Sequence, residues 1–120
     1  MGRYVLKPPI CADSTTYGFM IDISSSNTTS NTIAITSEAV NISIWAPATL
    51  TGTVTVQVAP DPDSAAAAFR ALQSTGSDVT LTASKCTTIT ASGFGAMRLS
   101  SSLAEGADRV FPVRIQTQVN

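Results

Sequence analysis

The 120-residue sequence contains no histidine and only two cysteines. Histidine is the side chain that most often acts as a general base near neutral pH, so its absence removes the commonest hydrolytic arrangements. The lysines, Lys7 and Lys85, lie outside any Ser-x-x-Lys motif, which leaves the many serines without a base to activate them. We therefore expect a protein that is not an enzyme and that needs no cofactor.

The same shortage argues against a metal site. A structural zinc ion takes four ligands, whereas Cys11 and Cys86 are the only thiols and no imidazole accompanies them. We expect both to be small buried thiols, with a disulfide between them as an alternative that a cytoplasm does not favour. Asp61 and Asp63 flank a proline in a pattern typical of a turn. A calcium ion at that turn is the weaker alternative, because calcium needs six or more oxygen ligands.

Charge is also scarce. Only 12% of the residues are charged and the formal net charge is −1. Nucleic-acid-binding proteins usually present a basic face, and the seven Lys and Arg residues here are scattered along the chain, so no nucleic-acid partner is expected. No apolar run approaches the ~20 residues of a membrane span. The first nine residues have no apolar core of a secretory signal, so we expect synthesis in a cytoplasm and no membrane partner.

Aromatic residues make up 6% of the chain, and Trp45 is the only tryptophan. We expect Trp45 to be a packing residue in the core or at its rim. A sugar-stacking platform formed with Tyr4 and Tyr17 is the alternative. What the chain has instead is serine and threonine, roughly a quarter of all residues. A neutral, hydroxyl-rich surface can pack against another protein at little desolvation cost, which favours a role in making contacts.

Alternating polar and apolar residues indicate β-strands along most of the chain. In residues 51–60, Val54, Val56 and Val58 point one way and the polar residues between them the other. Val40, Ile42 and Ile44 are expected to share one face in the same manner. Other short strands are predicted at 19–23, 32–36, 69–72, 79–81, 87–90, 96–100 and 109–119.

Two segments break the simple strand pattern. The four alanines before Phe69 predict a loop or a single helical turn. Pro112 predicts an edge position or a bulge at the start of the last strand, which is expected to bury Val113, Ile115, Thr117 and Val119 on one face. Eight or nine short strands separated by turn signals are typical of a sandwich or barrel.

The expected architecture is all-β, a single-domain β-sandwich of jelly-roll type with an extended N-terminal arm. Residues 1–16 form the predicted arm, because Pro8 and Pro9 prevent a helix or a central strand from running through it. Residues 17–120 form the predicted sandwich domain. No internal repeat or linker divides them.

Four segments resemble a known family. They are Val54-Thr55-Val56-Gln57-Val58-Ala59-Pro60-Asp61, Phe69-Arg70-Ala71-Leu72-Gln73-Ser74, Gly76-Ser77-Asp78-Val79-Thr80-Leu81 and Phe94-Gly95-Ala96-Met97-Arg98-Leu99-Ser100-Ser101. In these segments the chain is similar to small structural proteins of tailed-phage virions, in particular podophage-type capsid decoration or cement proteins. The resemblance covers roughly the C-terminal half. Ala59-Pro60-Asp61-Pro62 departs from the Ser-x-Asp-Gly turn of that pattern, and Ala68 stands where an aromatic residue is common, which argues against a ligand site at the turn.

The resemblance implies a non-catalytic virion protein that decorates and cements the capsid by contacts to the major capsid protein, as a homo-oligomer or a lattice of copies. The alternative is a carbohydrate-binding module for host adhesion on the tail. An extended arm can pair with a neighbour's sheet edge, and many copies on a lattice multiply weak contacts. The predicted interface residues lie in the arm and in the last strand: Arg3, Tyr4, Val5, Leu6, Lys7, Pro8, Pro9, Ile10, Arg114, Gln116, Gln118 and Asn120.

Overall fold

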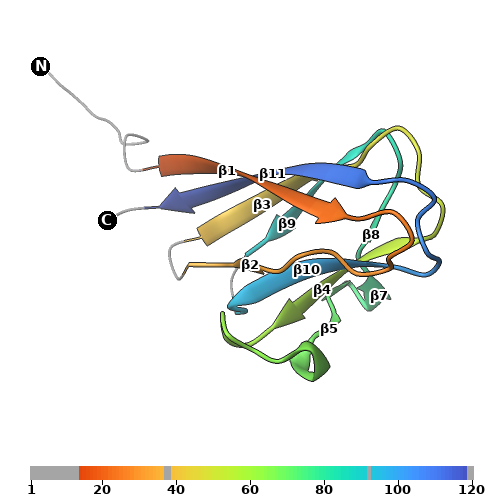
Figure 1. Cartoon of the computed structure of the whole chain (residues 1–120). Helices are drawn as coiled ribbons and strands as arrows, with labels where there is room; N and C mark the ends of the chain where they lie inside the picture. The colour runs from red at the N-terminus through yellow and green to blue at the C-terminus, as the bar shows by residue number, and fades with distance from the viewer. Residues whose placement is uncertain (1–13, 37–38, 92, 119–120) are drawn as a thin grey trace, which may run out of the picture.

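Two antiparallel sheets face each other in the computed structural model, which describes residues 14–36, 39–91 and 93–118 (Figure 1). The all-β sandwich predicted from the sequence is therefore confirmed. The first sheet has the order β1 (Ser14–Ile23), β11 (Arg109–Gln118), β3 (Ala39–Trp45) and β9 (Cys86–Thr90). The second has the order β2 (Ile33–Ala34), β10 (Ala96–Ser101), β4 (Val54–Ala59) and β5 (Arg70–Ala71), with β8 (Thr80–Leu81) also paired to β4.

The strand pairs are nested within one another along the chain. β1 pairs with β11 and β2 with β10, while β3 pairs with β9, and β4 pairs with β5 and β8. This is the pairing of one long antiparallel hairpin that has been rolled up so that successive strands alternate between two sheets. It is the topology of a jelly roll. The two ends of the described chain consequently lie at the same end of the sandwich (Figure 1).

The core fills the space between the two sheets with branched aliphatic side chains. Ile21, Ile42 and Ile44 of the first sheet have no exposed surface, and neither do Val56 and Leu99 of the second. Each such side chain contributes roughly 1.5–3 kcal/mol through burial. The alternation that predicted the strands at 40–45 and 51–60 thus also predicted which residues form the core.

The register of β3 corrects one predicted inward residue. Val40 was expected to lie in line with Ile42 and Ile44, but it is only partly buried. The pairing of β3 with β11 shifts register between Gln116 and Thr117, so that Ala39 lies opposite Thr117 and is buried instead. An irregularity of this kind changes which side chains face the core, because strand side chains alternate with a period of two.

The position of β11 corrects the prediction for Pro112. β11 is a central strand between β1 and β3, not an edge strand. The ladder with β3 begins at Val113, opposite Ile44, so the residue beside Pro112 is Trp45, the last residue of β3. Proline is tolerated there because its missing amide proton falls where the ladder ends. Val113, Ile115 and Thr117 are buried as predicted, whereas Val119 lies outside the described residues.

The first strand is longer than predicted. Alternation indicated a strand at 19–23, but β1 begins at Ser14 and pairs with β11 without interruption up to Ile23. Residues 14–16 of the predicted arm therefore form part of the sheet. Residues 1–13 lie outside the described residues. The polar residues at the start of β1 carry no alternation, which is why the sequence pattern did not reveal the extension.

The connection between β4 and β9 follows the sequence prediction. The alanines form a single 3-10 turn, η2 (Ala66–Ala68), and a short hairpin joins β6 (Gln73–Ser74) to β7 (Ser77–Asp78). Thr75 and Gly76 at its tip have positive φ angles of 54° and 85°. Phe69 is buried, and the guanidinium of Arg98 lies 4.3 Å from the centre of its ring. This cation–π contact joins the segment to β10.

A buried carboxylate joins the loops at the end of the sandwich that lies opposite the start of β1. Glu105, in the loop between β10 and β11, is 1% exposed, and its carboxylate accepts hydrogen bonds from the backbone amides of Thr51 and Gly52 at 2.8 and 3.0 Å. It also accepts hydrogen bonds from the Ser101 hydroxyl at 2.7 Å and from Nε of Arg109 at 2.8 Å. We call these five residues the loop clasp.

Candidate docking face

The outer face of the first sheet is the surface on which the predicted interface residues of β11 lie. Ile21, Ile44 and Val113 point into the core, so the residues between them point outward from the same strands. On β1 these are Gly18, Met20 and Asp22; on β11, Val110, Pro112, Arg114 and Gln116; on β3, Asn41, Ser43 and Trp45; on β9, Cys86, Thr88 and Thr90. We call this surface the docking face.

An apolar row crosses the docking face from edge to edge. Met20 is paired with Pro112, and Trp45 is paired with Cys86. The pair of Val113 with Ile44 places Pro112 beside Trp45, which completes the row. Met20 is 59% exposed and Trp45 is 42% exposed, and Val110, next to the row on β11, is 45% exposed. Exposed apolar groups gathered on one face indicate a contact site for another protein.

Amide and hydroxyl side chains border the apolar row. Ser43 and Thr88 are cross-strand partners, and their hydroxyl oxygens lie 2.8 Å apart. Further along the face, the side-chain amide of Asn41 donates to Oε1 of Gln116 at 3.3 Å. These groups already satisfy part of one another's hydrogen-bonding capacity. A partner protein can therefore cover them at little desolvation cost.

Two charged groups lie on the half of the docking face nearest β1. Arg114 is paired with Gly18, and its Nε lies 3.9 Å from the place that a β-carbon of Gly18 would occupy. Asp22 lies further along β1, opposite Val110. Within the described part of the chain, no ion pair involves either side chain; the one ion pair there joins Glu105 to Arg109.

The structure brings some of the predicted interface residues together and leaves others undescribed. Arg114 and Gln116 lie side by side on the docking face, separated by one inward residue of β11. Gln118 ends β11, and its side chain lies outside the described residues. The arm residues Arg3, Tyr4, Val5, Leu6, Lys7, Pro8, Pro9 and Ile10, together with Asn120, also lie outside them. Sequence reasoning missed the contribution of Met20, Pro112 and Trp45, because only the strand register places them in one row.

Two residues differ from their predicted environment. Cys86 was expected to be a buried thiol, but it is a free, exposed cysteine at the end of the apolar row. Trp45 was expected in the core or at its rim, but it points outward from the sheet. Both lie on the outward side of their strands, since Trp45 directly follows the inward-pointing Ile44 and is the cross-strand partner of Cys86. Cys11 and Tyr4 lie outside the described residues, as does the side chain of Tyr17.

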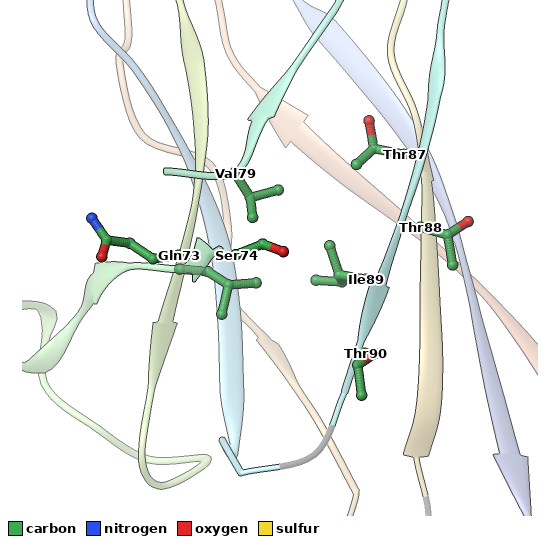
Figure 2. Close-up of a pocket in the computed structure, with 8 residues that line it drawn as sticks. Gln73, Ser74, Val79, Thr87, Thr88, Ile89 and Thr90 are labelled. Atoms are coloured by element: carbon green, nitrogen blue, oxygen red, sulfur yellow. The ribbon is translucent and has the colours of Figure 1, made fainter. Parts of the chain in front are cut away.

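A hollow of about 340 Å³ opens between β9 and the β6–β7 hairpin. Figure 2 shows Val79, Ser74 and Ile89 pointing into this space, whereas Thr88 points away from it. Leu72 contributes to the lining, together with Gln73, Thr87 and Thr90. The lining holds no aromatic ring of the described residues. A sugar-binding site generally offers such a ring for stacking, so the hollow does not supply what the carbohydrate-binding alternative requires.

Among residues 14–36, 39–91 and 93–118, no three His, Cys, Asp or Glu side chains gather in a way that could hold a metal ion. Asp61 and Asp63 lie in the predicted turn after β4, where the Ser64 amide donates to the Asp61 carbonyl at 3.2 Å. Within the described chain, no helix has the length and apolar character needed to cross a membrane.

Comparison with known proteins finds weak similarity to solved structures. No family model matches the chain, and neither does any curated protein. A subunit of the Bacillus endospore appendages, described as disulfide-linked pili, is 16% identical with a TM-score of 0.44 over 95% of this chain and 99% of that one. A chain of the cyanophage Pam1 capsid asymmetric unit is 16% identical with a TM-score of 0.48 over 90% of this chain and 86% of that one.

Proposed function

We propose that this chain is a non-catalytic structural protein of a bacteriophage virion that cements the capsid by binding the major capsid protein through its docking face. The observation that carries the proposal is the apolar row of Met20, Pro112, Trp45 and Cys86 on a sheet face whose other side chains are mostly uncharged. The resemblance of the C-terminal half to podophage-type decoration proteins supports the same role. A jelly roll is compatible with it, since this fold serves capsid and lectin domains alike.

The side chains of the docking face are of the kinds found in protein–protein interfaces, which suits binding to a capsid surface. Interface cores are depleted in charge and enriched in aromatic residues and methionine, and the row presents Trp45 and Met20 in this way. The surrounding hydroxyls and amides resemble the polar rim of an interface. Each copy need bind only weakly, because a symmetric lattice of copies adds many such contacts together.

The copy number of the chain in purified virions tests the location. Quantitative mass spectrometry should find many copies in a simple ratio to the major capsid protein. A handful of copies per particle would place the chain in the tail or neck and favour the host-adhesion alternative. Its absence from the particle would reject a virion role.

Binding to particles that lack the protein tests the docking face itself. Purified wild-type chain should co-sediment with such particles and raise the temperature at which they release their genome. Trp45→Ser should weaken this binding by about tenfold or more, because a central aromatic side chain often dominates an interface. Leu103→Ser is the matched control: Leu103 is 57% exposed but lies in the loop between β10 and β11, away from the face. Two outcomes would contradict a role for this face: an equal loss of binding in both variants, or no loss of binding in either.

A further inference from the structure

The free edge of β1 is an open template for pairing with another strand. Among the strands of the described residues, β1 is the outermost of its sheet, and it runs for 10 residues beside β11 without a bulge. The amide of Asp22 donates to the side chain of Asn31 at 2.8 Å, so it points away from β11. Because antiparallel residues alternate in the direction of their hydrogen bonds, Gly18 and Met20 also direct their amides and carbonyls toward the free edge.

β1 lacks the features with which proteins usually protect a sheet edge. Its sequence, STTYGFMIDI, contains no lysine and no proline. Only Asn31 covers part of the edge among the described residues, and it does so near the C-terminal end, at Asp22. Phe19 and Met20, in the uncovered part, are 42% and 59% exposed. A long edge without lysine or proline, and with exposed apolar side chains, is where another chain pairs.

The outer face of β1 carries a protruding apolar side chain and, beside it, a hollow that could receive such a side chain. Met20 is the most exposed of the large apolar side chains described. Two residues away, Gly18 has no side chain, and a hollow of about 370 Å³ opens there. The hollow is lined by Gly18, Phe19, Met20, Pro112, Val113 and Arg114. A surface that presents a knob and a hole side by side is self-complementary under a two-fold axis.

We propose that two copies of this chain pair antiparallel through their β1 strands, with Phe19 opposite Phe19 of the second copy. In this register Met20 of each copy lies opposite Gly18 of the other, on the docking-face side, and fills the hollow there. Met20 and Gly18 form the hydrogen-bonded pairs, since both face the free edge. The two phenylalanines form a non-hydrogen-bonded pair, in which side chains approach most closely. The result is one continuous sheet with four strands from each copy.

The charges of the docking face favour a second copy over an unrelated strand. Arg114 reaches over Gly18 toward the edge of the sheet, as the 3.9 Å approach of its Nε shows. In the proposed register, Asp22 of the second copy lies opposite residue 16, one row from Gly18 on the same face. Each copy thus brings to the seam a guanidinium and a carboxylate that have no ion-pair partner among the described residues, and the two-fold axis places opposite charges near each other twice.

The oligomeric state of the purified full chain tests the proposal without any virion, so its failure is separate from failure of the cement role. Light scattering after size exclusion should give twice the 12.4 kDa mass of one chain. Met20→Lys should raise the dissociation constant at least about tenfold, because it brings a cation to the partner's Arg114. Trp45→Lys is the control, since Trp45 lies two strands from the edge, and it should leave the dimer intact. A monomer at all concentrations would overturn the proposal.

A charge exchange tests the contact between Arg114 and Asp22. Arg114→Asp and Asp22→Arg should each weaken the dimer, because each places two like charges at the seam. The double variant should restore it. Weakening by both single variants without restoration in the double variant would contradict the proposed proximity of the two side chains.

Cross-linking tests the register. In a chain with Cys11→Ser and Cys86→Ser, Phe19→Cys should form a disulfide-linked dimer under mild oxidation, since the α-carbons of such a pair lie about 4.5 Å apart. Asp22→Cys is the matched control and should not cross-link to itself, because Asp22 lies opposite residue 16 of the second copy. Cross-linking by Asp22→Cys and not by Phe19→Cys would overturn the register. A dimer that neither Met20→Lys nor the charge exchange affects would overturn the interface.

Discussion

The carboxylate of Glu105 accepts hydrogen bonds from the consecutive backbone amides of Thr51 and Gly52, so one side chain from the loop between β10 and β11 holds the loop between β3 and β4. The backbone of Glu105 joins a third loop, because its carbonyl accepts from the Ser26 amide at 2.8 Å and its amide donates to the Asn27 carbonyl at 3.1 Å. Three connections at one end of the jelly roll are thus fixed by a single residue.

Removal of this carboxylate should destabilise the whole domain. Glu105→Ala leaves the Thr51 and Gly52 amides and the Arg109 guanidinium without their acceptor, and breaking a buried charge pair in this way costs about 3–5 kcal/mol. Urea denaturation should show the loss in the free energy of unfolding. Asp63→Ala removes an exposed carboxylate in a turn and should change that free energy by less than about 0.5 kcal/mol. Similar losses in both variants would contradict the role of the loop clasp.

The loop clasp should also make stability depend on acid. Burial of the Glu105 carboxyl raises its pKa, but the hydrogen bonds from Thr51, Arg109, Gly52 and Ser101 outweigh that effect and lower the pKa from 4.5 to about 2. Because the folded state holds the proton less tightly than the unfolded state, Glu105 stabilises the fold above pH ~4.5 and loses this effect as the pH falls toward ~2. The contribution is on the order of 3 kcal/mol, since the pKa falls by about 2.5 units and one unit corresponds to about 1.4 kcal/mol.

Glu105→Gln provides the measurement for this pH dependence. Thermal unfolding of wild type between pH 5 and pH 2 should show a progressive fall in the melting temperature, expected from the titration of Glu105. Glutamine does not titrate, so the variant should begin less stable at pH 5 and lose less stability over the same range. Parallel curves for the two proteins would show that another carboxyl governs the acid response.

A methyl group at Gly52, whose backbone amide binds the Glu105 carboxylate, should also disrupt the loop clasp. A β-carbon there would lie 2.5 Å from Oγ of Ser101 and 2.6 Å from the amide nitrogen of Leu103, closer than real contacts allow. Gly52→Ala should therefore cost about 1–3 kcal/mol, as overpacking generally does. Gly76→Ala is an informative comparison, because nothing lies within 4 Å and only its φ of 85° opposes a side chain. Chemical denaturation would rank the two, with Gly52→Ala expected to be the more harmful.

The exposed thiol of Cys86 offers a probe of the docking face. In free protein carrying Cys11→Ser, a maleimide should modify Cys86 readily, because this cysteine is exposed and unpaired. The same thiol should react at least about tenfold more slowly when the protein is bound to particles, since the proposed interface covers the apolar row. Mass spectrometry of the labelled chain measures both rates. Equal rates would show that the partner binds elsewhere.

The local sequence pattern determined which segments form strands and which side chains alternate. Val54 and Val56, or Ile42 and Ile44, face one side because of a period of two, which no distant contact needs to supply. The turn at Asp61 was predicted in the same way, from local backbone preferences, and so was a loop or single helical turn before Phe69. The all-β class and the sandwich followed from the number and spacing of these segments.

Only the tertiary structure decided which strands are central, which edge is open, and which outward side chains meet. The central place of Pro112, the exposure of Cys86 and the row that joins Met20 to Trp45 depend on pairing between residues far apart in the chain. Glu105 gave no sequence signal at all, because a single acid in a polar loop resembles any surface residue until the loops that surround it assemble. The physical reason is that the register between strands far apart in the chain leaves no periodic pattern in the local sequence of either strand.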